Sequence, residues 1–168
     1  MTAAPVVNED RHASYTDAHI KGILRGVKTI AMVGASTNWN RPSYFAMKYL
    51  QDKGYRVFPV NPGAAGQTVL GEKIFASLRD IPEKIDMVDV FRAAEHVPPI
   101  AADAVAIGAK VLWMQLGVRN DTAAETAEKA GLTVIMNRCP KIEYGRLSGE
   151  LGWHGFNSGV ITSKRRKI

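Results

Sequence analysis

The chain has little cysteine and no long apolar run, and each shortage excludes a class of protein. Its 168 residues include one cysteine, Cys139, so neither an internal disulfide nor a cysteine-based zinc site can form. No stretch reaches the roughly 18 apolar residues that span a bilayer, and the polar residues 1–11 lack the hydrophobic core of a secretory signal. We therefore expect a cytoplasmic protein with no membrane segment.

Most of the excess positive charge lies in one short stretch near the end of the sequence. The net charge is +6, but Lys164–Lys167 carries four of the positive charges in a stretch without acidic residues. Such a basic end is usually solvated, and the rest of the chain is close to neutral, so we expect no nucleic-acid partner. The composition, 46% hydrophobic and 23% charged, is that of one globular domain with a proper core.

Apolar runs alternate with segments of helical periodicity along most of the chain. We expect strands at residues 29–33, 55–60, 86–91, 110–114 and 132–136. Helices are expected over 17–25, from about 42 to 53, over 95–107 and over 122–129, with a short helical turn within 77–82. Strands and helices that alternate at this spacing form parallel sheets through right-handed crossovers. The sequence predicts a Rossmann-like, doubly wound α/β fold of three layers with about five parallel strands.

The two ends of the chain lack this alternation. We expect residues 1–27 to form an arm and a first helix, with the first 14 residues loose because they show no periodicity. Pro98 and Pro99 favour a third helix that begins just after them. Residues 146–168 are too few to build a core of their own, so we expect them to wrap around the domain and to end in the basic tail.

Small, polar or basic residues follow each expected strand. Carboxyl ends of parallel strands meet at one edge of the sheet, which is where such sheets bind ligands. The five strand ends are Gly34-Ala35-Ser36, Asn61-Pro62, Phe91-Arg92, Gln115-Leu116-Gly117 and Asn137-Arg138-Cys139. A strand that leads through a small-residue turn into a helix presents backbone N–H groups to a phosphate. The first strand end therefore predicts a phosphorylated ligand.

The first turn does not by itself identify the nucleotide. It does not complete the G-x-G-x-x-G fingerprint, and Asn61 stands where NAD-binding folds normally place an acidic residue for the ribose hydroxyls. Ordinary NAD binding is therefore disfavoured, although an NAD(P)-binding oxidoreductase stays an alternative. Arg41 and Arg92 are the arginines that we expect to contact phosphate; for each, the alternative is a surface arginine without a ligand.

No reactive side chain completes a catalytic or metal site in the sequence. Cys139 follows Arg138, a cation that would lower the thiol pKa, and the alternative is a small buried hydrophobic residue. Ser36 lacks the G-x-S-x-G surroundings of a nucleophile. The histidines show no metal-ligand spacing. Trp39, in the polar loop after the first strand, is a candidate to cover a ligand.

An ordered series of motifs gives the chain a family resemblance. The motifs are Val-Gly-Ala-Ser at 33–36 with Arg-Pro-Ser at 41–43, Pro-Val-Asn-Pro at 59–62, Ser-Leu-Arg-Asp-Ile-Pro at 77–82, Val-Asp-Val-Phe-Arg at 88–92, Trp-Met-Gln-Leu-Gly-Val at 113–118 and Asn-Arg-Cys-Pro-Lys-Ile-Glu at 137–143. Together they resemble the stand-alone CoA-binding domain proteins, which are similar to the N-terminal CoA-binding domain of the succinyl-CoA synthetase alpha subunit. The resemblance covers about residues 28–145 and implies a CoA-binding Rossmann-like domain there.

The resemblance also implies a set of CoA contacts. It places the first turn and Arg41 at the CoA phosphates or adenosine, and Asn61 at the adenine side, while Cys139 with Pro140 resembles an Asn-Cys-Pro segment of the synthetase subunit. The full set of expected cofactor-binding residues is Gly34, Ala35, Ser36, Arg41, Asn61, Pro62, Phe91, Arg92, Gln115, Leu116, Gly117, Asn137 and Cys139, with no catalytic and no metal residue.

The expected function is that of a CoA-binding or acyl-CoA-binding protein that acts as a sensor, carrier or regulatory module without catalysis of its own. The synthetases that it resembles use a phosphorylated histidine from another domain and an ATP-grasp partner. An alternative is therefore the CoA-binding subunit of an acyl-CoA synthetase-type enzyme completed by a partner chain. A homo-oligomer is the other form of assembly that we consider.

Overall fold

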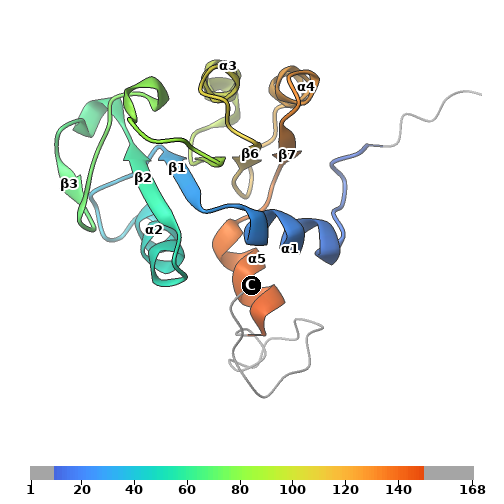
Figure 1. The fold of residues 1–168 in the computed structure, drawn as a ribbon, viewed down its shortest axis with the longest axis horizontal. Helices are drawn as coiled ribbons and strands as arrows, with labels where there is room; N and C mark the ends of the chain where they lie inside the picture. The colour runs from blue at the N-terminus through green and yellow to red at the C-terminus, as the bar shows by residue number, and fades with distance from the viewer. Residues whose placement is uncertain (1–9, 150–168) are drawn as a thin grey trace, which may run out of the picture.

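A parallel sheet forms the centre of the molecule in a computed structural model that describes residues 10–149 (Figure 1). Its strands run in the order β2-β1-β5-β6-β7. Their bounds are β1 (Thr29–Val33), β2 (Arg56–Val60), β5 (Met87–Val90), β6 (Val111–Met114) and β7 (Thr133–Ile135). Every pairing between neighbours is parallel. β2 lies on one side of β1, and β5, β6 and β7 follow in order on the other side, so the sheet is doubly wound as expected.

Helices cover both faces of the sheet and complete three layers. The helices α1 (Asp17–Gly26), α2 (Pro42–Asp52) and α5 (Pro140–Ser148) lie on one face, and α3 (Val97–Ala106) and α4 (Asp121–Lys129) lie on the other (Figure 1). The expected Rossmann-like three-layer α/β fold is confirmed.

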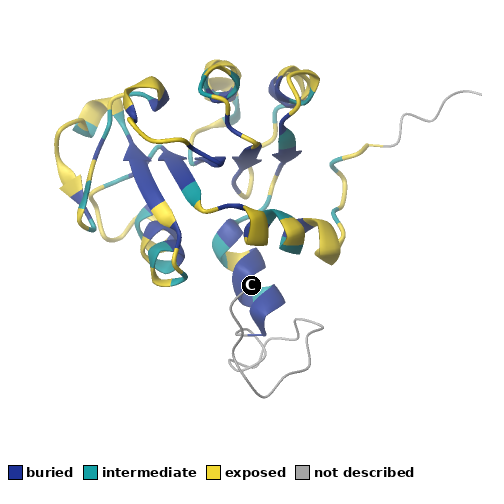
Figure 2. Ribbon diagram, viewed as in Figure 1, coloured by how far each residue is buried: buried dark blue, intermediate teal, exposed yellow. Residues whose placement is uncertain are grey.

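Side-chain alternation along each strand divides the core into two halves. Leu112 packs under α3 and α4, whereas its neighbour Trp113 packs under α1, α2 and α5. Successive residues of a strand point to opposite faces, and a parallel sheet covered on both sides is apolar on both. The strands are accordingly dark along nearly their whole length when the ribbon is coloured by burial (Figure 2).

The third long helix begins earlier than the sequence predicts. Pro98 and Pro99 lie inside the first turn of α3, which starts at Val97 after a 3-10 turn at Ala94–His96. A proline is tolerated there because first-turn N–H groups have no acceptor within the helix. The expectation that the helix begins after both prolines was therefore wrong.

The long loop after β2 contains structure that the sequence did not indicate. A two-stranded hairpin, β3 (Thr68–Val69) and β4 (Glu72–Lys73), lies between a 3-10 turn at Pro62–Ala64 and another at Leu78–Asp80. The second turn agrees with the predicted helical turn within residues 77–82. Strands of two residues are too short to leave a periodic signal in the sequence.

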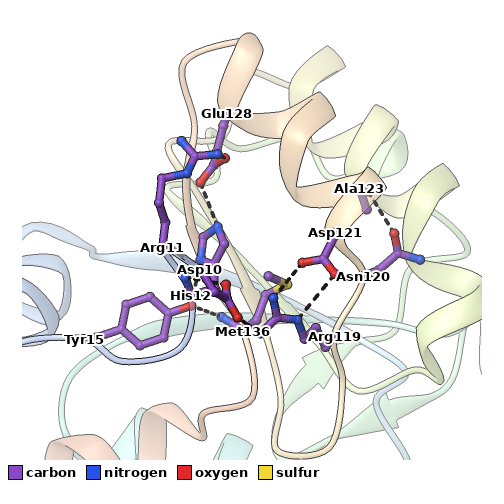
Figure 3. Close-up of polar contacts among 10 residues, drawn as sticks. All are labelled: Asp10, Arg11, His12, Tyr15, Arg119, Asn120, Asp121, Ala123, Glu128 and Met136. Carbon is purple, nitrogen blue, oxygen red and sulfur yellow. Dashed lines mark hydrogen bonds and ion pairs between the residues drawn. The ribbon is translucent and has the colours of Figure 1, made fainter. Parts of the chain in front are cut away.

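The segment before α1 is bound to the domain (Figure 3). Asp10 pairs with Arg119 at 2.8 Å, and His12 Nε2 lies 2.9 Å from Glu128 Oε1 on α4. The expectation that residues 10–14 are loose was therefore wrong. Ion pairs between distant segments produce no periodicity in the sequence, so they could not be predicted from it.

Parts of the expected terminal elements lie outside the described residues. These are residues 1–9 and 150–168, which include the basic tail. Within residues 10–149, none of the helices combines the length and the apolar character that crossing a bilayer requires.

Candidate functional site

A groove made of three adjoining pockets follows the carboxyl ends of the strands. The central pocket lies between the loop after β1 and the start of α2; a second pocket lies on its β2 side and a third on its β6 side. Arg92 borders all three pockets. Gly34 and Asn61 are shared by the β2-side and central pockets, and Phe91 by the central and β6-side pockets. The three pockets therefore form one continuous groove at the edge of the sheet where the sequence predicts a ligand.

Gly34 lets two strand ends approach each other beneath the central pocket. Its φ is +88°, and a Cβ at this position would lie 2.5 Å from the backbone oxygen of Phe91. The N–H groups of Gly34 and Ala35 donate to the Val60 carbonyl at 2.9 and 3.3 Å. These two amides therefore hold the fold, and our expectation that they face a phosphate was wrong because β2 already supplies their acceptor.

Two arginines provide positive charge at the central pocket. Arg41 precedes α2 and Arg92 follows β5; both are exposed, and neither pairs with a carboxylate among the described residues. By contrast, Arg79 pairs with Asp103 at 2.8 Å. Ser36 Oγ accepts a hydrogen bond from Asn38 N at 3.1 Å and keeps its own hydroxyl proton to donate. Unused guanidinium donors and a hydroxyl form a suitable site for phosphate.

Asn61 joins the two turns that border the central pocket. Its Nδ2 donates to the Ala35 carbonyl at 2.9 Å, and its Oδ1 accepts from Gly63 N at 2.9 Å. An aspartate could not make the first of these bonds, since an ionised carboxylate only accepts. It would also add negative charge beside a proposed anion site. The amide at this position thus fits a ligand that brings its own negative charge.

The β2-side pocket has an apolar floor and a polar rim. Its volume is about 230 Å³. Apolar side chains from β1, β2 and α3 line it together with Pro62 and Leu78, while Ser77, His96 and Asp103 stand around it. An apolar hollow with polar groups at its edge suits a ring system such as a nucleotide base.

The β6-side pocket is larger and more apolar. It measures about 580 Å³. Phe45, Leu116 and Ile142 line it and remain 46%, 55% and 44% exposed, although hydrophobic residues of this size are usually buried. Such a concentration of exposed apolar side chains marks a binding surface. Phe45 and Ile142 were not among the expected site residues, because on an amphipathic helix they cannot be told from core positions by sequence alone.

Gln115, which lines the β6-side pocket, forms a buried polar pair with Asp89 behind it. Gln115 Nε2 donates to Asp89 Oδ1 at 2.9 Å. Asp89 is completely buried, and burial raises its pKa to about 7, although the hydrogen bond from Gln115 opposes the rise. Asp89 Oδ2 has no hydrogen-bond partner among the described residues. This carboxyl was not among the expected site residues, because its place in the middle of an apolar strand does not indicate a role in the site.

Cys139 borders the same pocket just before α5. Burial raises the pKa of its thiol, and the negative charge of Asp89 raises it further. The Arg138 guanidinium lies instead over the Tyr15 ring, 5.4 Å from its centroid. The suggestion that Arg138 lowers the thiol pKa was therefore wrong: adjacency in sequence does not place the cation beside the sulfur.

Gly117 and Asn137, two of the expected contact residues, lie outside the three pockets and bond to each other. Gly117 N donates to Asn137 Oδ1 at 2.8 Å, and Asn137 has a φ of +54°. This bond joins the loops after β6 and β7, and neither residue lines a groove pocket. All the other expected cofactor-binding residues line at least one of the three pockets. Trp39 is 68% exposed and lines none of the three pockets.

The N-terminal segment reaches the same loops. The Tyr15 hydroxyl accepts a hydrogen bond from Met136 N at 2.8 Å, one residue before Asn137 (Figure 3). On the other side of Asn137, Trp113 Nε1 donates to the Arg138 carbonyl at 2.9 Å. The backbone that leads from β7 into α5 is therefore held at both ends, which fixes Cys139 at the pocket. Among residues 10–149, no cluster of histidine, cysteine or acidic side chains is arranged to hold a metal ion.

Comparisons with known proteins give a consistent result. A family described as "CoA binding domain" matches residues 28–145. The uncharacterized protein YneT of Bacillus subtilis is 40% identical over 127 residues, which are 76% of this chain and 93% of YneT. The crystal structure of Prb, a protein redesigned for binding, is 42% identical with a TM-score of 0.78, covering 81% of this chain and 94% of Prb.

A longer relative contains the same region as a small part. The ADP-forming acetate-CoA ligase II of Archaeoglobus fulgidus is 30% identical over 107 residues, which are 62% of this chain but 16% of the ligase. The similarity to the ligase therefore concerns one region of a much larger protein.

Proposed function

The chain belongs to the CoA binding domain family, and from that premise we propose that it binds CoA or an acyl-CoA along the groove and acts as a binding module without catalysis of its own. CoA consists of an adenine ring, phosphates and a long pantetheine arm. The groove offers an apolar hollow, a cationic centre and a larger apolar pocket in the same order. This match in order supports the proposal.

The unpaired arginines at the central pocket are the observation that carries it. Arg41 and Arg92 both line the central pocket, and Arg92 also borders the β2-side and β6-side pockets. Exposed arginines without an acidic partner leave their donors to water, and a phosphate accepts two such bonds from one guanidinium. Asn61 keeps carboxylate charge away from the same place. We assign Ser36, Arg41 and Arg92 to the phosphates.

The remaining residues are assigned by their pockets. Asn61 and Pro62 border the place proposed for adenine, while Phe91, Gln115, Leu116 and Cys139 border the place proposed for the pantetheine arm. CoA would supply a thiol or thioester at the end of that arm. The chain would supply the surface that holds the arm and shields it from water.

Calorimetric titration tests the proposal directly. We expect CoA to bind more tightly than NAD or NADP, and Arg41→Ala and Arg92→Ala each to weaken CoA binding by about tenfold or more, the usual value of a hydrogen bond to a charged group. Arg25→Ala is the matched control, because Arg25 is also exposed and lies on α1 away from the groove. Binding of NAD without CoA, or equal losses in all three variants, would overturn the assignment.

A second candidate function is a CoA-binding subunit of an acyl-CoA synthetase-type enzyme. It is favoured by the similarity to the acetate-CoA ligase. The chain, however, covers 93% of YneT, a protein of comparable size, which favours the stand-alone module. Co-purification with an ATP-grasp chain, and turnover of acid, ATP and CoA by the pair, would support the subunit instead.

A further inference from the structure

A buried carboxyl, that of Asp89, lies behind Gln115 of the β6-side pocket. Asp89 lies in β5 between Met32 of β1 and Trp113 of β6 in the sheet register. Apolar side chains surround it, and its one hydrogen bond among the described residues comes from Gln115 Nε2 at 2.9 Å. Burying a carboxyl at such a position costs free energy, which points to a role for its charge.

The charge state of Asp89 determines which way the Gln115 amide points. An ionised carboxylate only accepts hydrogen bonds, whereas a glutamine amide has a donating nitrogen end and an accepting oxygen end. The nitrogen end of Gln115 must therefore face Asp89, and Oε1 is left for the other side. Gln115 is 6% exposed and borders the β6-side pocket, so Oε1 is the polar atom that it can offer to a ligand.

We propose that Asp89 is a positioning residue, which orients the Gln115 amide so that Oε1 accepts a hydrogen bond from an amide N–H of the pantetheine arm. This inference rests on the proposed function and deepens it. The arm carries two secondary amides, and an amide N–H that enters an apolar pocket without an acceptor loses its bonds to water uncompensated. One fixed acceptor thus favours an amide-bearing arm over a plain alkyl chain of the same length.

Protonation of Asp89 removes this constraint. A neutral carboxylic acid both donates and accepts, so it can pair with either end of the Gln115 amide. Burial raises the pKa of Asp89 to about 7, so the orientation is enforced above that pH and is released below it. Affinity for the arm should therefore fall as the pH drops through neutrality.

Other titratable groups lie on the helices over this face. Cys139 is the one whose pKa Asp89 raises. Glu143 and Arg146 of α5 form an ion pair at 2.7 Å. The remaining groups are Asp17, His19, Lys21 and Arg25 of α1, Tyr44, Lys48, Tyr49 and Asp52 of α2, and Lys141 and Tyr144 of α5. Asp89→Asn keeps all of them, so a pH effect that persists in this variant belongs to another group.

The experiment measures binding of two ligands to three variants. CoA carries the arm, and adenosine 3′,5′-bisphosphate carries the nucleotide and phosphates without it. We compare the unmodified protein with Asp89→Asn, Gln115→Met and the double variant at about pH 6 and about pH 8. Gln115→Met keeps the length of the side chain and removes the acceptor, while Asp89→Asn keeps the shape of the carboxyl and removes its charge.

We expect each single variant to bind CoA about five- to tenfold more weakly at the higher pH, as for the loss of one hydrogen bond, and to bind the bisphosphate unchanged. The double variant should be no weaker than Gln115→Met, because Asp89 acts through Gln115. The unmodified protein should lose CoA affinity at the lower pH relative to the bisphosphate, and Asp89→Asn should not.

Each other outcome is also decisive. Equal losses for both ligands, additive losses in the double variant, or a pH effect that persists in Asp89→Asn would overturn the inference. If Gln115→Met does not fold, the pH comparison between the unmodified protein and Asp89→Asn decides the question. If the unmodified protein binds neither ligand, the proposed function itself is wrong.

Discussion

Replacement of Gly34 by alanine should damage both stability and ligand binding, and the chain contains a matched control. Gly34 has a φ of +88°, and a Cβ there would lie 2.5 Å from the Phe91 oxygen and 3.1 Å from Arg92 Cδ. Gly54 has a similar φ of +97°, but a Cβ there would meet nothing within 4 Å. Gly54→Ala therefore reports the conformational penalty alone, and Gly34→Ala adds the steric one.

The magnitudes follow from these contacts. A non-glycine residue in this region of φ costs about 1 kcal/mol, and we expect that loss for Gly54→Ala. An added carbon that displaces the backbone costs about 1–3 kcal/mol more, which brings Gly34→Ala to about 3 kcal/mol. For a chain of this size, these losses correspond to falls in Tm of about 2–4 °C and about 6–12 °C.

Thermal unfolding and CoA titration together measure the two effects. Because relief of the contact must move the end of β5, which carries Phe91 and Arg92, we expect Gly34→Ala to lose CoA affinity at least tenfold and Gly54→Ala to retain it. Equal losses of stability in the two variants would refute the steric argument. Unchanged CoA affinity in a folded Gly34→Ala protein would refute the assignment of the phosphate site.

Two further predictions concern groups outside the phosphate site. Burial tends to raise the pKa of Asp86, but hydrogen bonds from the N–H groups of Lys28 and Thr29 and from Lys110 lower it on balance. The contribution of Asp86 to the free energy of unfolding is thus fully present above the ordinary aspartate pKa, and it is lost as the pH falls through the lowered pKa of the folded state. Asp86→Ala should lose about 2 kcal/mol in urea unfolding near neutral pH, with the difference shrinking in acid, and an undiminished difference would contradict this. Burial and the charge of Asp89 raise the pKa of Cys139, so alkylation of its thiol at mildly alkaline pH should be slower than alkylation of a free thiol. The reaction should be faster in Asp89→Asn than in the unmodified protein. Equal rates in these two proteins would contradict an effect of the Asp89 charge on the thiol pKa.

The architecture was largely predictable from the sequence because its signals are local. β1, β2, β5, β6 and β7 are short apolar runs bounded by polar residues. Two helices begin at a residue whose side chain caps them: Thr16 accepts a hydrogen bond from His19 N, and Asn120 accepts one from Ala123 N. The order of such elements implies the parallel sheet. The start of α3 and the hairpin of β3 and β4 were missed because first-turn prolines and two-residue strands leave no period to detect.

The position of the groove could likewise be predicted, but not the role of each side chain in it. Topology brings the strand ends together, and most of the expected contact residues line the three pockets. The Arg138 guanidinium turns toward Tyr15 instead of Cys139, and the amides of Gly34 and Ala35 donate to the Val60 carbonyl. These outcomes depend on partners distant in sequence, which a local motif does not specify.

A two-dimensional amide NMR titration with CoA shows whether CoA occupies the groove at the carboxyl edge of the sheet. CoA in the groove should shift amide signals at the strand ends and on α5, at Ser36, Phe91, Arg92, Leu116 and Ile142. Lys28, Thr29 and Asp86, which hydrogen-bond one another at the amino edge, should show no shift. Shifts confined to the amino edge, or shifts with NAD and none with CoA, would contradict CoA binding in the groove.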